Sequence, residues 1–307
     1  MGNLLSGCWF PDPRSVVTVT PSSAAGGGGF GFGSGAGGQG FGGAGGASGG
    51  LAISASASAS VETALASVPL TPPVEETYEL GRRLGAGSFG RVLAARARSR
   101  SGSEASGEEP PEVAVKLLDL SRIKASSVLR EWTVLQHIAA AAAAPAGTVA
   151  PAPGPSCFEV AGIVAFHGTV RAPGEVAFVF ELMHGGELFS LLVGRGAIPE
   201  PLVRRSIRPV IEALAFLHKH GVVHRDIKPE NLLLKAPVPD STPLADVGDL
   251  QLKIADFGLA QVIAADGTQR LVKSCGTWAY SAPEMNAPSR PGYGAPYDMC
   301  EATSATY

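Results

Sequence analysis

The pattern of apolar and polar positions changes character along this 307-residue chain. Between residues 78 and 182, short apolar runs separated by glycine and polar residues predict strands. The predicted strands are Tyr78–Leu84, Arg91–Arg96, Glu112–Leu118, Ile163–Val170 and Val176–Leu182. Apolar residues recur every three or four positions in Ser126–Ala140, which predicts one helix. These elements would form a small antiparallel sheet with a single helix beside it.

Beyond residue 187 the apolar spacing becomes mainly helical. Glu187–Val193 predicts a short helix and Pro201–His220 a long one, in which Pro209 would cause a kink or a broken turn. Two short strands, Leu232–Leu234 and Leu250–Ile254, flank an insertion rich in proline and aspartate. A sheet followed by helices predicts an α+β fold of two lobes with a cleft between them.

The first 75 residues differ in composition, and we expect them to be a disordered arm. Glycine dominates Ala24–Gly50, and Ser54–Ser60 alternates serine with alanine. Such stretches cannot bury enough apolar surface to offset the entropy of the chain. The glycine–phenylalanine tract could also serve self-association or RNA binding. However, no Lys or Arg lies between Pro21 and Gly81, which favours a flexible tether.

The N-terminus offers candidates for lipid attachment. Met1–Ser6 fits the N-myristoylation pattern, with the acceptor at Gly2 and a serine at position 6. Cys8 could take a palmitoyl chain, and two acyl chains anchor a protein stably where one does not. A chance match explains the same residues. A transit peptide is a weaker alternative, because such peptides are rich in arginine.

Composition narrows the classes of partner and compartment. The formal net charge of −3 gives no case for nucleic-acid binding. The four cysteines are scattered without a CxxC pair, which fits a reducing, cytoplasmic setting better than a disulfide framework or a zinc site. No uninterrupted apolar run is long enough to span a bilayer, so we expect membrane tethering only through acylation.

A glycine-rich turn between the first two predicted strands could bind phosphate, because glycines let backbone N–H groups approach phosphate oxygens. A plain hairpin turn would use the same glycines. A dinucleotide-binding turn would need a helix directly after it, whereas Arg91–Arg96 predicts a strand. The nucleotide-binding candidates in this segment are Leu84, Gly85, Gly87, Gly90 and Val92.

A lysine occupies the third predicted strand. Lys116 lies in an otherwise apolar run, and a buried ammonium group needs partners. Phosphate oxygens and a carboxylate would serve, and Glu131 borders the apolar face of the predicted helix. In isolation, both residues could equally be ordinary surface charges.

Two loops supply the remaining chemistry, one at residues 223–231 and one at residues 254–258. Their candidate side chains are Asp226, Lys228, Asn231 and Asp256. These are the groups needed to orient a hydroxyl nucleophile and to hold magnesium around a triphosphate. An isolated aspartate in a loop is usually a cap or turn residue, but the whole set in this order is a strong signal.

The order and spacing of these motifs resemble those of eukaryotic protein kinases. Lys-Pro-Glu-Asn at 228–231 and Gly-Thr at 276–277 are similar to serine/threonine kinases of the calcium/calmodulin-dependent or AGC-like groups. The resemblance implies ATP and Mg²⁺ as cofactors and a protein hydroxyl as phosphoryl acceptor. The implied roles are Asp226 as catalytic base, Lys228 on the transferred phosphoryl group, Asn231 and Asp256 on Mg²⁺, and Lys116 with Glu131 at the α- and β-phosphates.

By the same resemblance, Phe180–Met183 connects the two lobes. Backbone groups of Glu181 and Met183 would bind the adenine edge, and Phe180 would be the bulky gatekeeper beside it. The side chains implied above and below the adenine ring are Val92, Ala114 and Leu233.

Glu187 and Glu230 resemble positions that meet substrate arginines in kinases selective for basic peptides. They imply a preference for basic residues before the target Ser/Thr. Glu187 is equally well explained as a carboxylate at the N-terminus of a helix.

Residues 256–284 resemble an activation segment. Lys273 occupies a position where relatives often carry a phosphorylated threonine, so Ser274 and Thr268 remain as phosphorylation candidates that could pair with Arg225. Trp278 replaces a proline that is frequent in relatives. We expect the hydroxyl of the preceding residue, Thr277, to bond near Asp226.

The resemblance covers about residues 78–299 and ends at Cys300. It implies an N-lobe at 76–183, a partial C-lobe at 184–299 in which Asp298 braces the catalytic loop, and a divergent polar tail at 300–307. We therefore expect a serine/threonine kinase with an incomplete C-terminal lobe. The alternative is a catalytically impaired module that binds ATP or partners without transfer. A small-molecule kinase is a weaker third reading, because the segment at 276–284 resembles a protein-substrate platform.

Overall fold

The computed structural model describes residues 65–66, 68, 71–87, 90–98, 111–143, 157–172, 174–264, 271, 275–282 and 292–305. The acylation candidates Gly2 and Cys8 lie outside the described residues, as do Thr268 and Ser274. None of the helices in the described ranges is long and apolar enough to cross a membrane.

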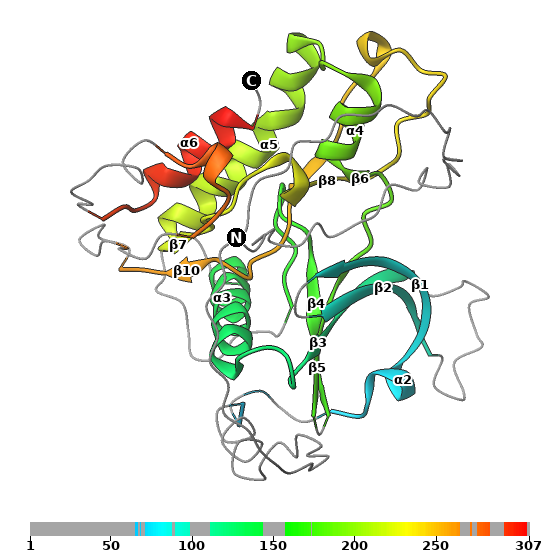
Figure 1. The fold of residues 1–307 in the computed structure, drawn as a ribbon, viewed down its shortest axis with the longest axis vertical. Coiled ribbons are helices and arrows are strands. Elements are labelled where there is room, and N and C mark those ends of the chain that lie inside the picture. Colours follow the sequence, from blue (N-terminus) through cyan, green and yellow to red (C-terminus); the bar gives the residue numbers. More distant parts are fainter. Residues whose placement is uncertain are drawn as a thin grey trace, which may run out of the picture.

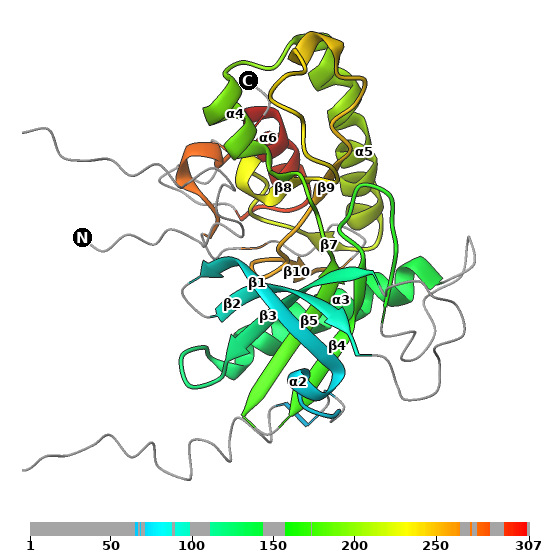
Figure 2. The same ribbon diagram turned by 90° about the vertical axis from the view of Figure 1, so that its right-hand side faces the viewer.

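One lobe is built on a five-stranded antiparallel sheet in the order β1-β2-β3-β5-β4 (Figure 1). Helix α3, Ala125–Ala143, lies beside one face of this sheet (Figures 1 and 2). The strands are Tyr78–Gly87 (β1), Gly90–Ala97 (β2), Glu112–Asp119 (β3), Phe166–Ala172 (β4) and Glu175–Glu181 (β5). The α+β prediction is confirmed, although β4 begins three residues later than expected. Ile163 instead forms an isolated bridge to Ile254 of the other lobe.

The segment before β1 wraps around the edge strand of this sheet. Leu65 and Val68 are fully buried in the apolar cluster that includes residues of α3, whereas Val74 joins the cluster on the opposite face. Between them, Thr71 N–H donates to the carbonyl of Arg171 on β4 (2.8 Å), and the Arg171 guanidinium donates to the carbonyl of Val68 (2.7 Å). The prediction that residues 1–75 are disordered is therefore wrong for the described residues between 65 and 75. A short helix, α2, Val74–Thr77, leads into β1.

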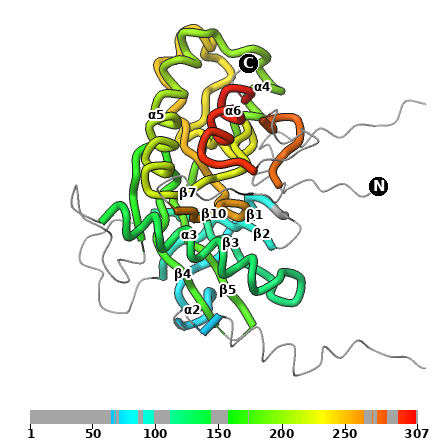
Figure 3. Tube along the Cα trace, turned by 90° about the vertical axis from the view of Figure 1, so that its left-hand side faces the viewer, coloured from blue at the N-terminus to red at the C-terminus, as the bar shows by residue number. Residues whose placement is uncertain are grey.

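The second lobe is mainly helical and lies above the sheet in Figure 1. Its helices are Leu188–Arg195 (α4), Glu200–Lys219 (α5) and Pro296–Ser304 (α6), and α6 lies against α5 (Figure 3). Its short strands are Gly186–Glu187 (β6), Val222–Val223 (β7), Leu232–Leu234 (β8), Leu252–Ile254 (β9) and Gln261–Val262 (β10). They pair as β6-β8-β9 and β10-β7. Single 3₁₀ turns occupy Pro229–Asn231, Leu244–Asp246 and Trp278–Tyr280.

Two sequence-based expectations about this lobe are corrected. Helix α5 runs through Pro209 as one element rather than breaking there. Residues 300–304, expected to be a polar tail, continue helix α6, in which Glu301 and Ala302 are buried.

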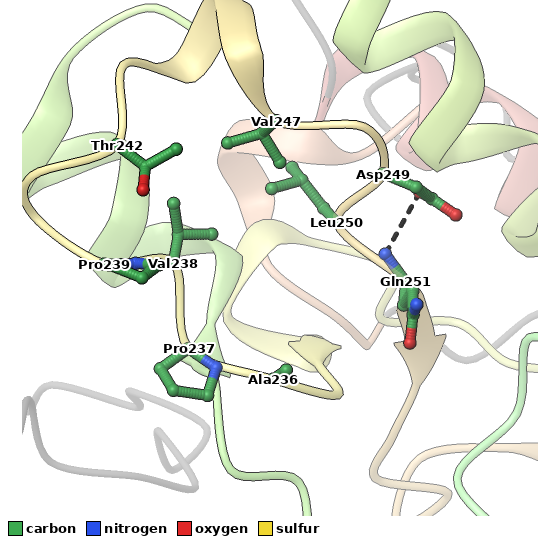
Figure 4. Close-up of a pocket in the computed structure, with 9 residues that line it drawn as sticks. All are labelled: Ala236, Pro237, Val238, Pro239, Thr242, Val247, Asp249, Leu250 and Gln251. Carbon is green, nitrogen blue, oxygen red and sulfur yellow. Dashed lines mark hydrogen bonds between the residues drawn. The ribbon is translucent and has the colours of Figure 1, made fainter.

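The insertion between β8 and β9 folds against α4. The guanidinium of Arg195 donates to the carbonyls of Pro239 (3.3 Å) and Thr242 (2.6 Å). Asp249 accepts the backbone N–H of Gln251 (3.1 Å), which leads the chain into β9 (Figure 4). The insertion forms a pocket of about 210 Å³ that opens to solvent and is lined mainly by the proline, valine and leucine side chains of the insertion itself. It lies beside the short sheet β6-β8-β9.

Candidate functional site

Lys116 forms a buried cluster with two carboxylates. Its ammonium nitrogen lies 2.6 Å from Glu131 Oε1 on α3 and 3.2 Å from Asp256 Oδ1. The side chains of Lys116, Glu131 and Asp256 are 14%, 4% and 19% exposed. Burial lowers the pKa of Lys116, but the two carboxylates outweigh it and the net direction is upward, so the lysine stays charged. The predicted pairing of Lys116 with Glu131 is confirmed.

Glu131 is more deeply buried than its partner. Burial raises the pKa of this carboxyl group, while the neighbouring Lys116 opposes that rise. The buried carboxylate of Glu131 on α3 needs the ammonium group of Lys116 on β3 as its partner. The position of the helix and the position of the lysine are therefore coupled.

Asp256 has an unusual backbone conformation. Its φ of 60° lies in the left-handed region, and its Oδ1 accepts the N–H of Gly258 (3.2 Å). The next residue, Phe257, is buried, and its ring meets the ring of His224 edge-on at 5.1 Å. Non-glycine residues in this region cost free energy and persist where the surroundings fix them, which is frequent at functional sites.

Asp226 is the centre of a second buried network. Its Oδ1 accepts the hydroxyl of Thr277 (2.9 Å), as expected, and its Oδ2 accepts the amide of Asn231 (2.9 Å). The Lys228 ammonium lies 3.0 Å from Asp226 Oδ2 and donates to the Thr277 hydroxyl at 3.0 Å. Asp226, Lys228 and Asn231 are each no more than 3% exposed. The structure thus brings these predicted residues together at one point.

The two networks adjoin. The backbone N–H of Ala255, the residue before Asp256, donates to the carbonyl of Asn231 at 2.9 Å. The sequence therefore predicted correctly that Asp256 and the loop carrying Asp226 are neighbours.

The residues present fit a hard divalent cation. Asn231 Oδ1 is buried and has no hydrogen-bond partner in the described part of the chain, while its amide nitrogen is held by Asp226. Amide and carboxylate oxygens suit magnesium, which uses one or two protein carboxylates together with substrate phosphates. The described residues contain no group of three or more His, Cys, Asp or Glu that could hold a metal ion.

A contiguous apolar cluster lies next to these networks. It contains the predicted ring-binding residues and the gatekeeper, all buried: Leu84, Val92, Ala114, Phe180, Met183 and Leu233. Phe180 lies opposite Ala114 in the pairing of β5 with β3. The cluster also includes residues of both lobes, so the predicted ring-binding residues belong to one buried core.

The connecting segment has a fixed backbone. Glu181 N–H donates to the carbonyl of Ala165 (3.0 Å), and the Glu181 carboxylate binds Lys253 and the N–H of Ala165. Met183 N–H has no backbone hydrogen-bond partner among the described residues. That donor is consistent with the adenine contact expected of Met183.

The glycine turn is described in part. Gly85 and Gly87 pair with Val92 and Gly90 across the hairpin. A side chain at Gly90 would place its Cβ 2.1 Å from the carbonyl oxygen of Leu117, so only glycine fits there. The strand directly after the turn excludes the dinucleotide-binding alternative.

Glu187 and Glu230 differ in their surroundings. Glu187 is 3% exposed and directly precedes α4, which fits the alternative of a carboxylate at the helix N-terminus. Glu230 Oε2 is buried without a hydrogen-bond partner among the described residues. Burial of Tyr280 raises the pKa of its hydroxyl, and the nearby carboxylate of Glu230 adds to this rise. Glu230 is therefore the better placed of the two to meet a cation.

Helix α6 supports the loop that carries Asp226. Asp298 is fully buried and accepts the backbone N–H groups of His224 and Arg225 (2.8 Å each) and the His218 ring nitrogen (2.8 Å). Arg225 has a φ of 71°, so this bracing stabilises a left-handed backbone. The expected role of Asp298 as a brace is confirmed.

Sequence reasoning missed a second support from the same helix. Glu301 Oε2 accepts the N–H of Ile227 at 2.8 Å. Glu301 follows Asp298 by three residues, which places both side chains on one face of a helix. This spacing could have predicted that Glu301 contacts the same loop as Asp298.

Comparison with known proteins gives a consistent picture. Residues 156–302 match the family described as Protein kinase domain. Calcium/calmodulin-dependent protein kinase type IV of Mus musculus is 40% identical over 137 residues, 45% of this chain and 26% of that protein. CBL-interacting serine/threonine-protein kinase 7 of Arabidopsis thaliana is 35% identical over 234 residues, 74% of this chain and 45% of that protein. CBL-interacting protein kinase 4 of Oryza sativa subsp. japonica is 34% identical over 223 residues, 69% and 40% of the two chains. The chain spans less than half the length of each of these relatives.

Proposed function

We propose that this chain, in which residues 156–302 belong to the protein kinase domain family, transfers the γ-phosphoryl group of ATP to a serine or threonine hydroxyl of a protein. The single observation that carries the proposal is the network around Asp226, in which Lys228, Thr277 and Asn231 all contact one buried carboxylate. Similarity to calcium/calmodulin-dependent and CBL-interacting kinases supports the choice of serine and threonine.

The chemistry assigns each group a step. Asp226 would accept the proton of the substrate hydroxyl as that oxygen attacks the γ-phosphorus, and the bond to the β–γ bridging oxygen breaks to release ADP. Lys228 would stabilise the negative charge on the transferred group. The 3.0 Å contact between Lys228 and Thr277 keeps the ammonium beside Asp226 before substrate arrives.

Asn231 and Asp256 are the residues that would hold Mg²⁺. When bound, the ion neutralises charge on the phosphate oxygens. Lys116 would bind the α- and β-phosphates, with Glu131 fixing the direction of its ammonium group. The apolar cluster around Ala114 would hold adenine.

Two finer features belong to the same proposal. Glu230, and Glu187 with it, would favour basic residues before the target hydroxyl, so a peptide array should show enrichment of Arg and Lys there. Acylation at Gly2 and Cys8 would tether the enzyme to a membrane. Incorporation of labelled fatty acid into the full chain, and its loss in Gly2→Ala and Cys8→Ser variants, tests this tether.

The decisive experiment measures radiolabel transfer from [γ-³²P]ATP to a basic peptide with one serine. Wild type should transfer label that is recovered as phosphoserine, and Asp226→Asn should be slower by roughly 10²–10⁴-fold. Asp246→Asn, an exposed aspartate of the insertion, is the matched control and should retain the wild-type rate. Nucleotide binding without transfer by wild type would instead favour an ATP-binding module.

A further inference from the structure

Helix α6 places a second carboxyl group directly beneath the catalytic loop. Glu301 has no exposed surface, and one of its oxygens, Oε2, accepts the N–H of Ile227 at 2.8 Å. Ile227 is the residue between Asp226 and Lys228, the two groups assigned to proton acceptance and charge stabilisation. Asp298, one turn earlier, already holds His224 and Arg225. One helix therefore fixes three backbone amides of this loop.

The same side chain reaches the activation segment. A Cβ atom on Gly276 would lie 3.2 Å from the other Glu301 oxygen, Oε1, and 2.4 Å from the Arg225 carbonyl. Gly276 precedes Thr277, whose hydroxyl bonds Asp226 at 2.9 Å. Glu301 thus lies under both segments that meet at Asp226.

The charges around Glu301 favour its neutral form. Burial, with Asp298 on its own helix and Asp226 on the loop, raises the pKa of this carboxyl to about 9, although hydrogen bonds from Ile227 and Tyr297 oppose the rise. The hydroxyl of Tyr297 also faces this carboxyl, and it donates to the Cys275 carbonyl (3.3 Å). Glu301 makes no ion pair in the described part of the chain. A neutral carboxyl accepts the Ile227 amide without adding a third negative charge.

We propose that Glu301 is a positioning residue for phosphoryl transfer, holding the Ile227 amide so that Asp226 and Lys228 keep their relative position. The proposal rests on the proposed kinase function. It concerns an acceptor oxygen and not a negative charge, so a group of the same shape that cannot ionise should replace Glu301.

The test compares two substitutions. Glu301→Gln keeps an acceptor oxygen, whereas Glu301→Met fills the space without one. Glu301→Met should lower kcat by roughly 10- to 100-fold with little change in KM for ATP, because a small displacement of catalytic groups has effects of this size. Glu301→Gln should stay within about twofold of wild type at neutral pH. Glu212→Gln, an exposed carboxylate on α5, is the control and should change nothing.

The pH profile separates positioning from general destabilisation. In wild type, ionisation of Glu301 above pH 9 adds charge beside Asp298 and Asp226, so kcat should fall there. That alkaline decline should be absent in Glu301→Gln. An unchanged decline, or equal losses of kcat in the Gln and Met variants, would overturn the proposal.

Hydrogen exchange of the peptide containing Ile227 gives a readout independent of activity. Exchange should be faster in Glu301→Met and unchanged in Glu301→Gln. If wild type transfers no phosphate, the proposed function fails, yet this exchange still decides whether Glu301 holds the loop. If Glu301→Met keeps both the wild-type exchange rate of the peptide containing Ile227 and the wild-type kcat, Glu301 is not a positioning residue. Should Glu301→Met not fold, the pH profile of Glu301→Gln decides it.

Discussion

Replacement of Asp298 by alanine should cost a large part of the stability of the helical lobe. The carboxylate has no exposed surface and accepts three hydrogen bonds of 2.8 Å, from the backbone of His224 and Arg225 and from the His218 ring. Each buried donor left without an acceptor costs about 1–3 kcal/mol. The two backbone amides cannot turn to another partner, so Asp298→Ala should destabilise the protein by about 2–6 kcal/mol.

The asparagine variant refines this estimate. Asp298→Asn retains one acceptor oxygen, but its NH₂ group faces a second donor, so about half of the loss should remain. The nearby carboxyl of Glu301 should ionise more easily once the charge of Asp298 is gone, which recovers a fraction of the cost.

Urea unfolding at pH 7, followed by circular dichroism, measures these differences. Asp246→Ala is the control, because this exposed aspartate belongs to the insertion and should change stability by no more than about 0.5 kcal/mol. The reasoning is refuted if Asp298→Ala unfolds within 1 kcal/mol of wild type, since typical domains have only about 5–15 kcal/mol in total.

Three further substitutions test other parts of the site. Glu131→Gln removes the carboxylate 2.6 Å from Lys116 and should lower kcat/KM for ATP about 10- to 100-fold in steady-state assays; an unchanged value would show that the pair is dispensable. Glu301 has a folded pKa of about 9 against an ordinary 4.5, so wild type loses stability as pH rises between these values. Relative to wild type, Glu301→Gln should therefore gain about 2–3 kcal/mol from pH 5 to pH 7, and parallel stability curves would exclude this. Gly276→Ala forces a side chain into a φ of 91° with its Cβ 2.4 Å from the Arg225 carbonyl, and should lower the melting temperature and kcat together. Wild-type melting of that variant would mean the turn can relax.

The residues that the sequence predicted best are those whose chemistry leaves few alternatives. Lys116 in an apolar strand needed a carboxylate, and Glu131 on the helix was the candidate that the structure places at 2.6 Å. Asp226, Asn231 and Lys228 lie within six residues, so their contacts depend mainly on one local loop conformation.

Contacts between distant segments were harder to predict. Leu65, Val68 and Val74 follow soon after the stretch that alternates serine with alanine, and their burial depends on the edge strand and on the guanidinium of Arg171, about a hundred positions away in the chain. Composition alone therefore suggested disorder up to residue 75.

Local propensity also misled in the helical lobe. Pro209 lacks a backbone N–H, yet α5 is continuous, because burial of its apolar face outweighs one missing hydrogen bond. Glu301 has an ionisable side chain and was assigned to a polar tail. Only the amide of Ile227, 74 positions earlier, explains why that side chain is buried.

Magnesium-dependent nucleotide binding tests the central claim most directly, namely that Lys116, Asn231 and Asp256 converge on one metal-bound nucleotide. The measurement is calorimetric titration of the full chain with a non-hydrolysable ATP analogue, with and without Mg²⁺. Wild type should bind the analogue more tightly with Mg²⁺, and Asp256→Ala should lose that difference while Asp246→Ala keeps it. Equal affinity of wild type with and without the ion, or a magnesium effect that persists in Asp256→Ala, would contradict the account.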